Sequence, residues 1–126
     1  MASHQEPNVN VCPHYHRAVE LVGRRWTGAI LMVLLQGASR FTDIVHAVPG
    51  LSDRLLSERL KELEAEGIVS RIVHPETPVR IEYQLTEKGH DLSGVAEAVT
   101  EWATRWLATG GLEATPNERE LAAIVH

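Results

Sequence analysis

The sequence has a single cysteine, Cys12, and no apolar run near the roughly 20 residues that a membrane-spanning helix needs. One cysteine excludes an intrachain disulfide. The first ten residues, MASHQEPNVN, lack the basic start and the apolar core of a secretory signal. These absences argue against a disulfide-stabilised secreted domain and an integral membrane protein, and they make the cytoplasm the expected compartment.

The chain also lacks an excess of basic residues, since its formal net charge is −5. Residues 91–126 hold two arginines against six acidic residues, a local charge of −4, whereas residues 1–39 carry +1 and residues 40–90 carry −2. DNA binding depends on the charge of the contact face rather than on the total. The acidity therefore lowers the expected non-specific affinity without excluding a nucleic-acid partner.

No Ser/His/Asp or Cys/His constellation, phosphate-binding loop or metal motif stands out. Cys12, His14 and His16 are metal-ligand types, but residues two apart point about 200° away from each other around a helix. We therefore expect no enzymatic activity, no metal site and no cofactor.

The chain has 126 residues, enough for one domain with a modest core. Residues 1–11 are polar and show no periodicity, so we expect a flexible arm. Residues 12–108 hold the periodic segments and form the expected domain. Residues 109–126 form a tail with one short helical pattern, NERELAAIV.

The segment Leu51–Gly67, LSDRLLSERLKELEAEG, predicts one helix with clear ends. Ser52 is a suitable N-cap, and Gly67 stands where a left-handed residue ends a helix. Leucines 56, 60 and 63 form one buried stripe, and charged residues occupy the opposite side. The segment before it, RFTDIVHAV, is a short amphipathic helix followed by a Pro49-Gly50 turn. The pair suggests a helix-turn-helix.

Three further helices are predicted. The first spans residues 13–22. The second spans residues 28–36, capped by Thr27 and apolar nearly all round, so it should be the central buried helix. The last runs from a Thr86 cap to about Ala108, with an apolar stripe along its length. Thr42 is the expected cap of the helix that ends near Val48, and residues 39–41 form a short extended bridge.

After Gly67 the apolar period changes from 3.6 to 2. Residues 68–74 and 79–85 alternate as two strands around the turn Pro75-Glu76-Thr77-Pro78, which predicts a β-hairpin. The fold class is therefore mainly α with a small β-hairpin (α+β), in the order of a winged helix-turn-helix. A plain α+β packing unit would not explain a stiff, arginine-bearing hairpin directly after a polar-faced helix.

The chain resembles the HxlR-type bacterial transcriptional regulators, a branch of the MarR-like winged-helix proteins. The resemblance implies a homodimeric, sequence-specific regulator of a neighbouring gene in a prokaryotic cytoplasm, dimeric through its terminal helices. The matching segments span about residues 12–106: Cys12-Pro13, LVGRRWTGAIL (21–31), RFTDI (40–44), PGLSDRLLSERLKELEAEGIV (49–69), HPETPVRIEYQLTEKG (74–89) and EWA (101–103).

The binding partner expected of such a regulator is double-stranded DNA that contains a pseudo-palindromic operator. Arginine pairs with guanine, lysine favours phosphate, and hydroxyls near helix N-termini bind phosphate. Arg59 lies nearer the buried stripe, where an internal ion pair is an equal expectation. For Arg54, solvent exposure or pairing with Glu58 is the alternative; for Arg80 it is a structural salt bridge. The expected DNA contacts are Thr42, Ser52, Arg54, Ser57, Lys61 and Arg80.

Cys12 is a candidate redox sensor. It stands at a predicted helix start, where the helix dipole favours a thiolate, and several HxlR-type regulators are similar in using an N-terminal cysteine to sense electrophiles or oxidants. A lone cysteine can equally be a small buried hydrophobe.

Val99, Trp102, Ala103 and Trp106 form the expected dimer interface on the last helix. Packing within one subunit is the alternative, and a small aromatic effector bound beside the indoles is another. A different functional class, a winged-helix protein-interaction module, would show exposed apolar groups on the outer face of the 52–66 helix.

Overall fold

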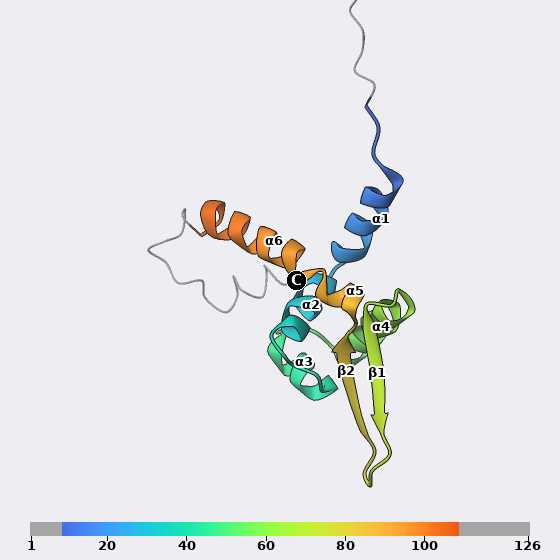
Figure 1. Ribbon diagram of the computed structural model, residues 1–126. Coiled ribbons are helices and arrows are strands. Elements are labelled where there is room, and N and C mark those ends of the chain that lie inside the picture. The colour runs from blue at the N-terminus through green and yellow to red at the C-terminus, as the bar shows by residue number, and fades with distance from the viewer. Residues whose placement is uncertain (1–8, 109–126) are drawn as a thin grey trace, which may run out of the picture.

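The computed structural model describes residues 9–108, which form six helices and one two-stranded antiparallel sheet (Figure 1). The predicted C-terminal tail lies outside the described residues, as does most of the predicted N-terminal arm. The order along the chain is α1 (Pro13–Val22), α2 (Thr27–Leu35), α3 (Phe41–Ala47), α4 (Asp53–Ala65), β1 (Val69–His74), β2 (Arg80–Leu85), α5 (Glu87–His90) and α6 (Ser93–Trp106).

The core lies where α2, α3 and α4 meet the start of the hairpin. The predicted leucine stripe of α4 is confirmed, because Leu56, Leu60 and Leu63 are almost completely buried. Helix α2 contributes Ile30, Leu31 and Leu34, but its opposite side is only half-buried. The remaining buried apolar residues are Trp26, Ile44, Val48, Leu51, Ile68 and Val69.

The hairpin has the predicted strands, with Val69 opposite Leu85, Arg71 opposite Tyr83, and Val73 opposite Ile81. Opposite residues of an antiparallel pair share a face. The expected extended bridge is not a strand of the sheet, although the Tyr83 amide donates a hydrogen bond to the Ser39 carbonyl at 2.8 Å.

Two predicted caps are wrong. Thr27 is the first residue of α2 and is buried, while Trp26 holds the cap position with φ of +78° and makes no side-chain cap bond. Burial of the Trp26 indole in the core compensates for this rarely populated backbone conformation. Thr42 lies inside the first turn of α3, where Arg40 is the cap residue.

The expected single helix after Thr86 is also wrong, because the chain forms α5 and then α6. Thr86 does cap α5, since its hydroxyl accepts from the Gly89 amide at 3.1 Å and donates to the Gly67 carbonyl at 2.6 Å. The Lys88 ammonium donates to the Glu66 carbonyl at 2.7 Å. These bonds hold α5 against the junction of α4 and β1, whereas α6 takes a new direction (Figure 1).

Helices α1 and α6 project away from the body of the molecule (Figure 1), and neither has a buried residue. The Arg17 guanidinium ties α1 to Glu66 through distances of 3.1 and 3.0 Å. No described helix is long and apolar enough to cross a membrane.

Candidate DNA-binding interface and sensor residues

Helix α4 is positioned by both of its ends. The Ser52 hydroxyl accepts a hydrogen bond from the Leu55 amide at 3.1 Å, which confirms the predicted N-cap. Gly67 has φ of +74°, which confirms the predicted left-handed stop. With its leucine stripe in the core, the helix presents its other side to solvent.

The outer side of α4 carries the cations expected there. The Arg54 side chain is 89% exposed and lies 3.3 Å from the Glu58 carboxylate, so the expected i,i+4 pair is present. Lys61 is exposed and Ser57 is half-buried. Apart from Ala65, the exposed positions of α4 are polar or charged. This surface lacks the apolar groups that a protein-interaction module would show.

Arg59 serves the interior. Its side chain is 10% exposed, donates to the Arg25 carbonyl at 3.1 Å and lies 3.2 Å from the Glu62 carboxylate. Of the two expectations for this residue, the structure shows the internal ion pair. Thr42 is exposed on the first turn of α3.

Arg80 opens β2 and is held by two carboxylates of the hairpin. Its guanidinium lies 3.3 Å from Glu76 and 3.4 Å from Glu82, and Glu82 also lies 3.6 Å from the His74 ring. The structural salt bridge considered for Arg80 is therefore present. Arg71 of β1 is exposed. The sequence did not indicate a role for it in binding, because the strand alternation placed it on the same face as apolar residues.

Cys12 is the N-cap residue of α1, with no side-chain cap bond, and is exposed. The expected helix start is confirmed, and the alternative of a buried cysteine is wrong within one chain. Two side chains that follow Cys12 on α1 lie beside carboxylates, since the His16 ring is 2.8 Å from Glu20 and Arg17 pairs with Glu66. Among residues 9–108, no group of three or more His, Cys, Asp and Glu side chains could hold a metal ion.

The apolar residues of α6 are open to solvent in the single chain. Exposure is 62% for Val99, 58% for Trp102 and 63% for Trp106, while Ala103 is half-buried. The alternative prediction, that the two indoles pack within one subunit, is therefore wrong. Tyr15 and Val19 of α1 are likewise exposed.

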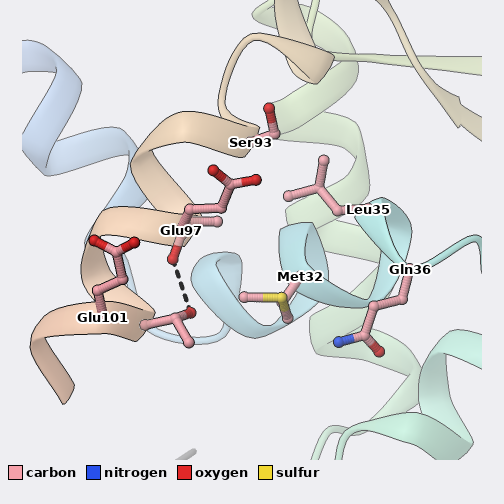
Figure 2. A pocket seen from close by; sticks show the side chains of 8 residues that line it. Met32, Leu35, Gln36, Ser93, Glu97 and Glu101 are labelled. Carbon is pink, nitrogen blue, oxygen red and sulfur yellow. Dashed lines mark hydrogen bonds between the residues drawn. The ribbon is translucent and has the colours of Figure 1, made fainter. Parts of the chain in front are cut away.

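Two hollows lie between α2 and the first part of α6. The larger, about 420 Å³, has Met32, Leu35 and Gln36 on one side and Glu97 and Glu101 on the other (Figure 2). The second, about 210 Å³, is lined mainly by apolar residues that include Leu31 and Val95. Neither indole lines these two hollows, so an aromatic effector beside Trp102 and Trp106 has no cavity among them.

Comparison with known proteins adds family membership to this geometry. The model of the HxlR-like helix-turn-helix matches residues 21–110. The HTH-type transcriptional regulator YvaP of Bacillus subtilis, described as uncharacterized, is 52% identical over 97 residues, which are 77% of this chain and 90% of YvaP. YodB of the same organism, also an HTH-type transcriptional regulator, is 45% identical over 79% of this chain and 89% of its own length.

Solved structures agree with the sequence matches. The reduced form of B. subtilis YodB superposes with a TM-score of 0.69, covering 77% of this chain and 95% of that chain at 45% identity. The quinone-bound form of YodB gives 0.66 at 42% identity, covering 76% of this chain and 100% of that chain. The redox regulator HypR in its oxidized form gives 0.69 at 33% identity, covering 75% and 96%. The chain therefore belongs to the HxlR-like helix-turn-helix family of transcriptional regulators, with the winged-helix fold that its sequence predicts.

Proposed function

We propose that this protein is a homodimeric regulator that binds a pseudo-palindromic DNA operator through α4 and the hairpin. The observation that carries the proposal is the polar, exposed outer side of α4. The helix itself is held at both ends and by its buried leucine stripe. A rigid helix with a polar outer face fits the DNA major groove. The proposed contacts are Thr42, Ser52, Arg54, Ser57, Lys61 and Arg80.

The proposal assigns different roles to these side chains. Arg54 is the base-reading residue, because its exposed guanidinium can exchange Glu58 for the edge of a guanine. Ser52 and Thr42 are in or next to first turns of helices, where phosphate is favoured. Arg80 already pairs with Glu76 and Glu82, which offset its charge, so its contribution should be small.

The first test uses DNA upstream of the protein's own gene. We expect protection of two half-sites about one helical turn apart, because each recognition helix of a dimer enters one major groove. Arg54→Ala should weaken operator binding by about 1–3 kcal/mol and relax base preference at one position per half-site. Fluorescence anisotropy with a set of single-base operator variants measures both effects.

Glu58→Ala is the control for Arg54→Ala, because it breaks the same surface ion pair and leaves the guanidinium in place. It should bind the operator at least as tightly as the parent. An Arg54→Ala protein that keeps the parent's affinity and base preference would show that α4 does not read the bases.

We further propose that Cys12 releases the operator when it reacts with an oxidant or an electrophile. Support comes from its exposure at the start of α1, beside the exposed apolar residues of that helix. Solved structures of relatives give further support. They include YodB after diamide treatment, YodB with bound quinone, and the redox regulator HypR in its oxidized form. Because the chain has one cysteine, a disulfide must join two chains or a chain and a small thiol.

Both reactions are chemically complete. Diamide takes up two electrons and two protons as two thiols form one disulfide. When the thiolate adds to a quinone, the carbon–sulfur bond replaces a π bond of the ring, the electron pair moves to a carbonyl oxygen that takes up a proton, and loss of the ring proton leaves a hydroquinone thioether. Modification at the start of α1 would shift one subunit against the other and change the half-site spacing without altering α4.

The measurement is operator binding before and after diamide or a benzoquinone. The parent should lose affinity at least tenfold, and Cys12→Ser should not respond. Equal responses from the two proteins, or no response from the parent, would assign Cys12 a structural role.

A further inference from the structure

A hollow of about 260 Å³ lies between α4 and the hairpin. Ser57, Leu60, Lys61 and Glu64 line it from α4, and Arg71 and Tyr83 line it from the strands. The four α4 residues follow the i, i+3, i+4, i+7 spacing of one helix face. The two strand residues are opposite each other in the ladder. The hollow is therefore built by two elements that the core holds together.

Arg71 occupies an unusual position on the hairpin. The paired residues that share its face are Val69, Val73, Ile81, Tyr83 and Leu85, so Arg71 is the one charged residue on an otherwise apolar face. Packing of an aliphatic residue against Leu60 and Tyr83 would satisfy the fold at this position. A guanidinium here instead brings positive charge to a hollow that Leu60 and Tyr83 also line.

The two cations of the hollow have no acidic partner within the part of the chain that the structure describes. Arg54, Arg59 and Arg80 each lie within 3.4 Å of a carboxylate, whereas Lys61 and Arg71 have no ion pair or side-chain hydrogen bond there. Glu64 is the single carboxylate that lines the hollow. Its charge leaves the three ionised groups with a net charge of +1.

A phosphate diester matches this arrangement. Lysine supplies a point charge, arginine a planar set of donors, and the Ser57 hydroxyl a further donor. The hollow, at about 260 Å³, is several times larger than the roughly 30 Å³ that one water molecule takes up in the liquid, so it has room for a phosphate group. Lys61 follows Arg54 by seven residues on the same face of α4, so one DNA duplex could meet both side chains.

We propose that Lys61 and Arg71 together hold one backbone phosphate of the DNA, so that the base of the hairpin, rather than Arg80, is its phosphate anchor. This inference rests on the proposed operator binding. It adds Arg71, and the pairing of Arg71 with Lys61, to the interface. It also explains why Arg80 can remain engaged with Glu76 and Glu82.

The test compares Lys61→Ala, Arg71→Ala, the double variant and Arg80→Ala in the full chain, with the mapped operator and an unrelated duplex of equal length. Arg71→Ala should weaken binding to both duplexes about tenfold, the size expected of one charge-assisted hydrogen bond. The slope of log K against log salt should fall by about 1. Arg80→Ala should change both quantities less than Arg71→Ala does.

Arg71→Lys is the matched variant, because it keeps the charge and removes the planar donors. It should retain the salt slope and lose only part of the affinity. The double variant should lose less than the product of the single losses, since both residues hold one phosphate. Thermal melts of the Lys61 and Arg71 variants should match the parent, because both cations are exposed.

Parent-like affinity and salt slope for Arg71→Ala would overturn the inference while leaving operator binding intact. A larger slope change for Arg80→Ala would overturn it as well. If the parent binds no duplex, the proposed function itself fails. Inorganic phosphate provides the last arm: stabilisation of the parent at millimolar phosphate, lost in Arg71→Ala while operator affinity stays unchanged, would assign the hollow to a free anion.

Discussion

Arg59 is a charged residue of α4 that stabilises the fold rather than facing solvent. Its guanidinium is nearly buried between the helix and the loop before α2, where it donates to the Arg25 carbonyl and pairs with Glu62. Glu62 also lies 3.3 Å from Arg24, so one carboxylate serves two arginines. The contact therefore fixes the loop that places Trp26 in the core.

Truncation of this side chain should destabilise the protein without a direct effect on the DNA face. In Arg59→Ala the Arg25 carbonyl loses its donor, and we expect a loss of about 1–3 kcal/mol in the free energy of unfolding. Urea denaturation measures it. Arg54→Ala is the control, since its exposed ion pair contributes about 0–1 kcal/mol. Equal stabilities for the two variants would contradict the structural role of Arg59.

At the scale of elements, Gly89 determines how α5 meets the hairpin. A Cβ atom added there would overlap the Ile68 carbonyl oxygen and would lie 2.9 Å from Leu85 Cδ2 and 3.2 Å from Ile68 Cγ2. The hydrogen bonds of Thr86 and Lys88 hold α5 in place, so the short helix cannot move away freely. The close approach requires glycine at this position.

We expect Gly89→Ala to lower the free energy of unfolding by about 1–3 kcal/mol, the usual range for overpacking. Gly94→Ala in α6 is the matched control, because its added Cβ would meet no described atom within 4 Å beyond its chain neighbours and its own helix backbone. In a helix, alanine is favoured over glycine by up to about 1 kcal/mol, so the control should be neutral or stabilising. Parallel urea titrations compare them, and a neutral Gly89→Ala would show that α5 is mobile.

At the scale of the whole molecule, α1 and α6 contribute no fully buried residue to the single-chain core. Tyr15, Val99, Trp102 and Trp106 are each more than half exposed, whereas Leu21 and Val22 at the end of α1 are half-buried against the core. Large aromatic side chains are enriched at protein interfaces and costly to leave in water. A second copy of the chain, seated on these helices, is the occupant that we propose.

Trp102→Ala should raise the dimer dissociation constant about thirtyfold, the effect of removing one interface hot spot of about 2 kcal/mol. Sedimentation velocity across a concentration series measures it. Thr104→Ala is the control, since it is exposed and lies about 200° around α6 from Trp102. A parent that sediments as a monomer at micromolar concentration would refute dimerisation through these helices.

Much of the architecture follows from local patterns in the sequence. The leucine stripe, the Ser52 cap and the Gly67 stop define α4, because periodicity and cap chemistry act over a few residues. Alternation defines the hairpin for the same reason. The family follows from segments that keep their register over most of the domain. Once the buried stripe was known, the helical period alone predicted that the α4 cations would be exposed.

Only the tertiary structure decided which groups meet across long chain separations. Burial of Trp26 displaced the cap expected at Thr27, and the chain forms α5 and α6 where the sequence indicated a continuous helix. The hairpin carboxylates pair with Arg80 and leave Arg71 open beside Lys61. Helix and strand type depend on neighbours along the chain, whereas side-chain burial and ion pairing depend on neighbours in space.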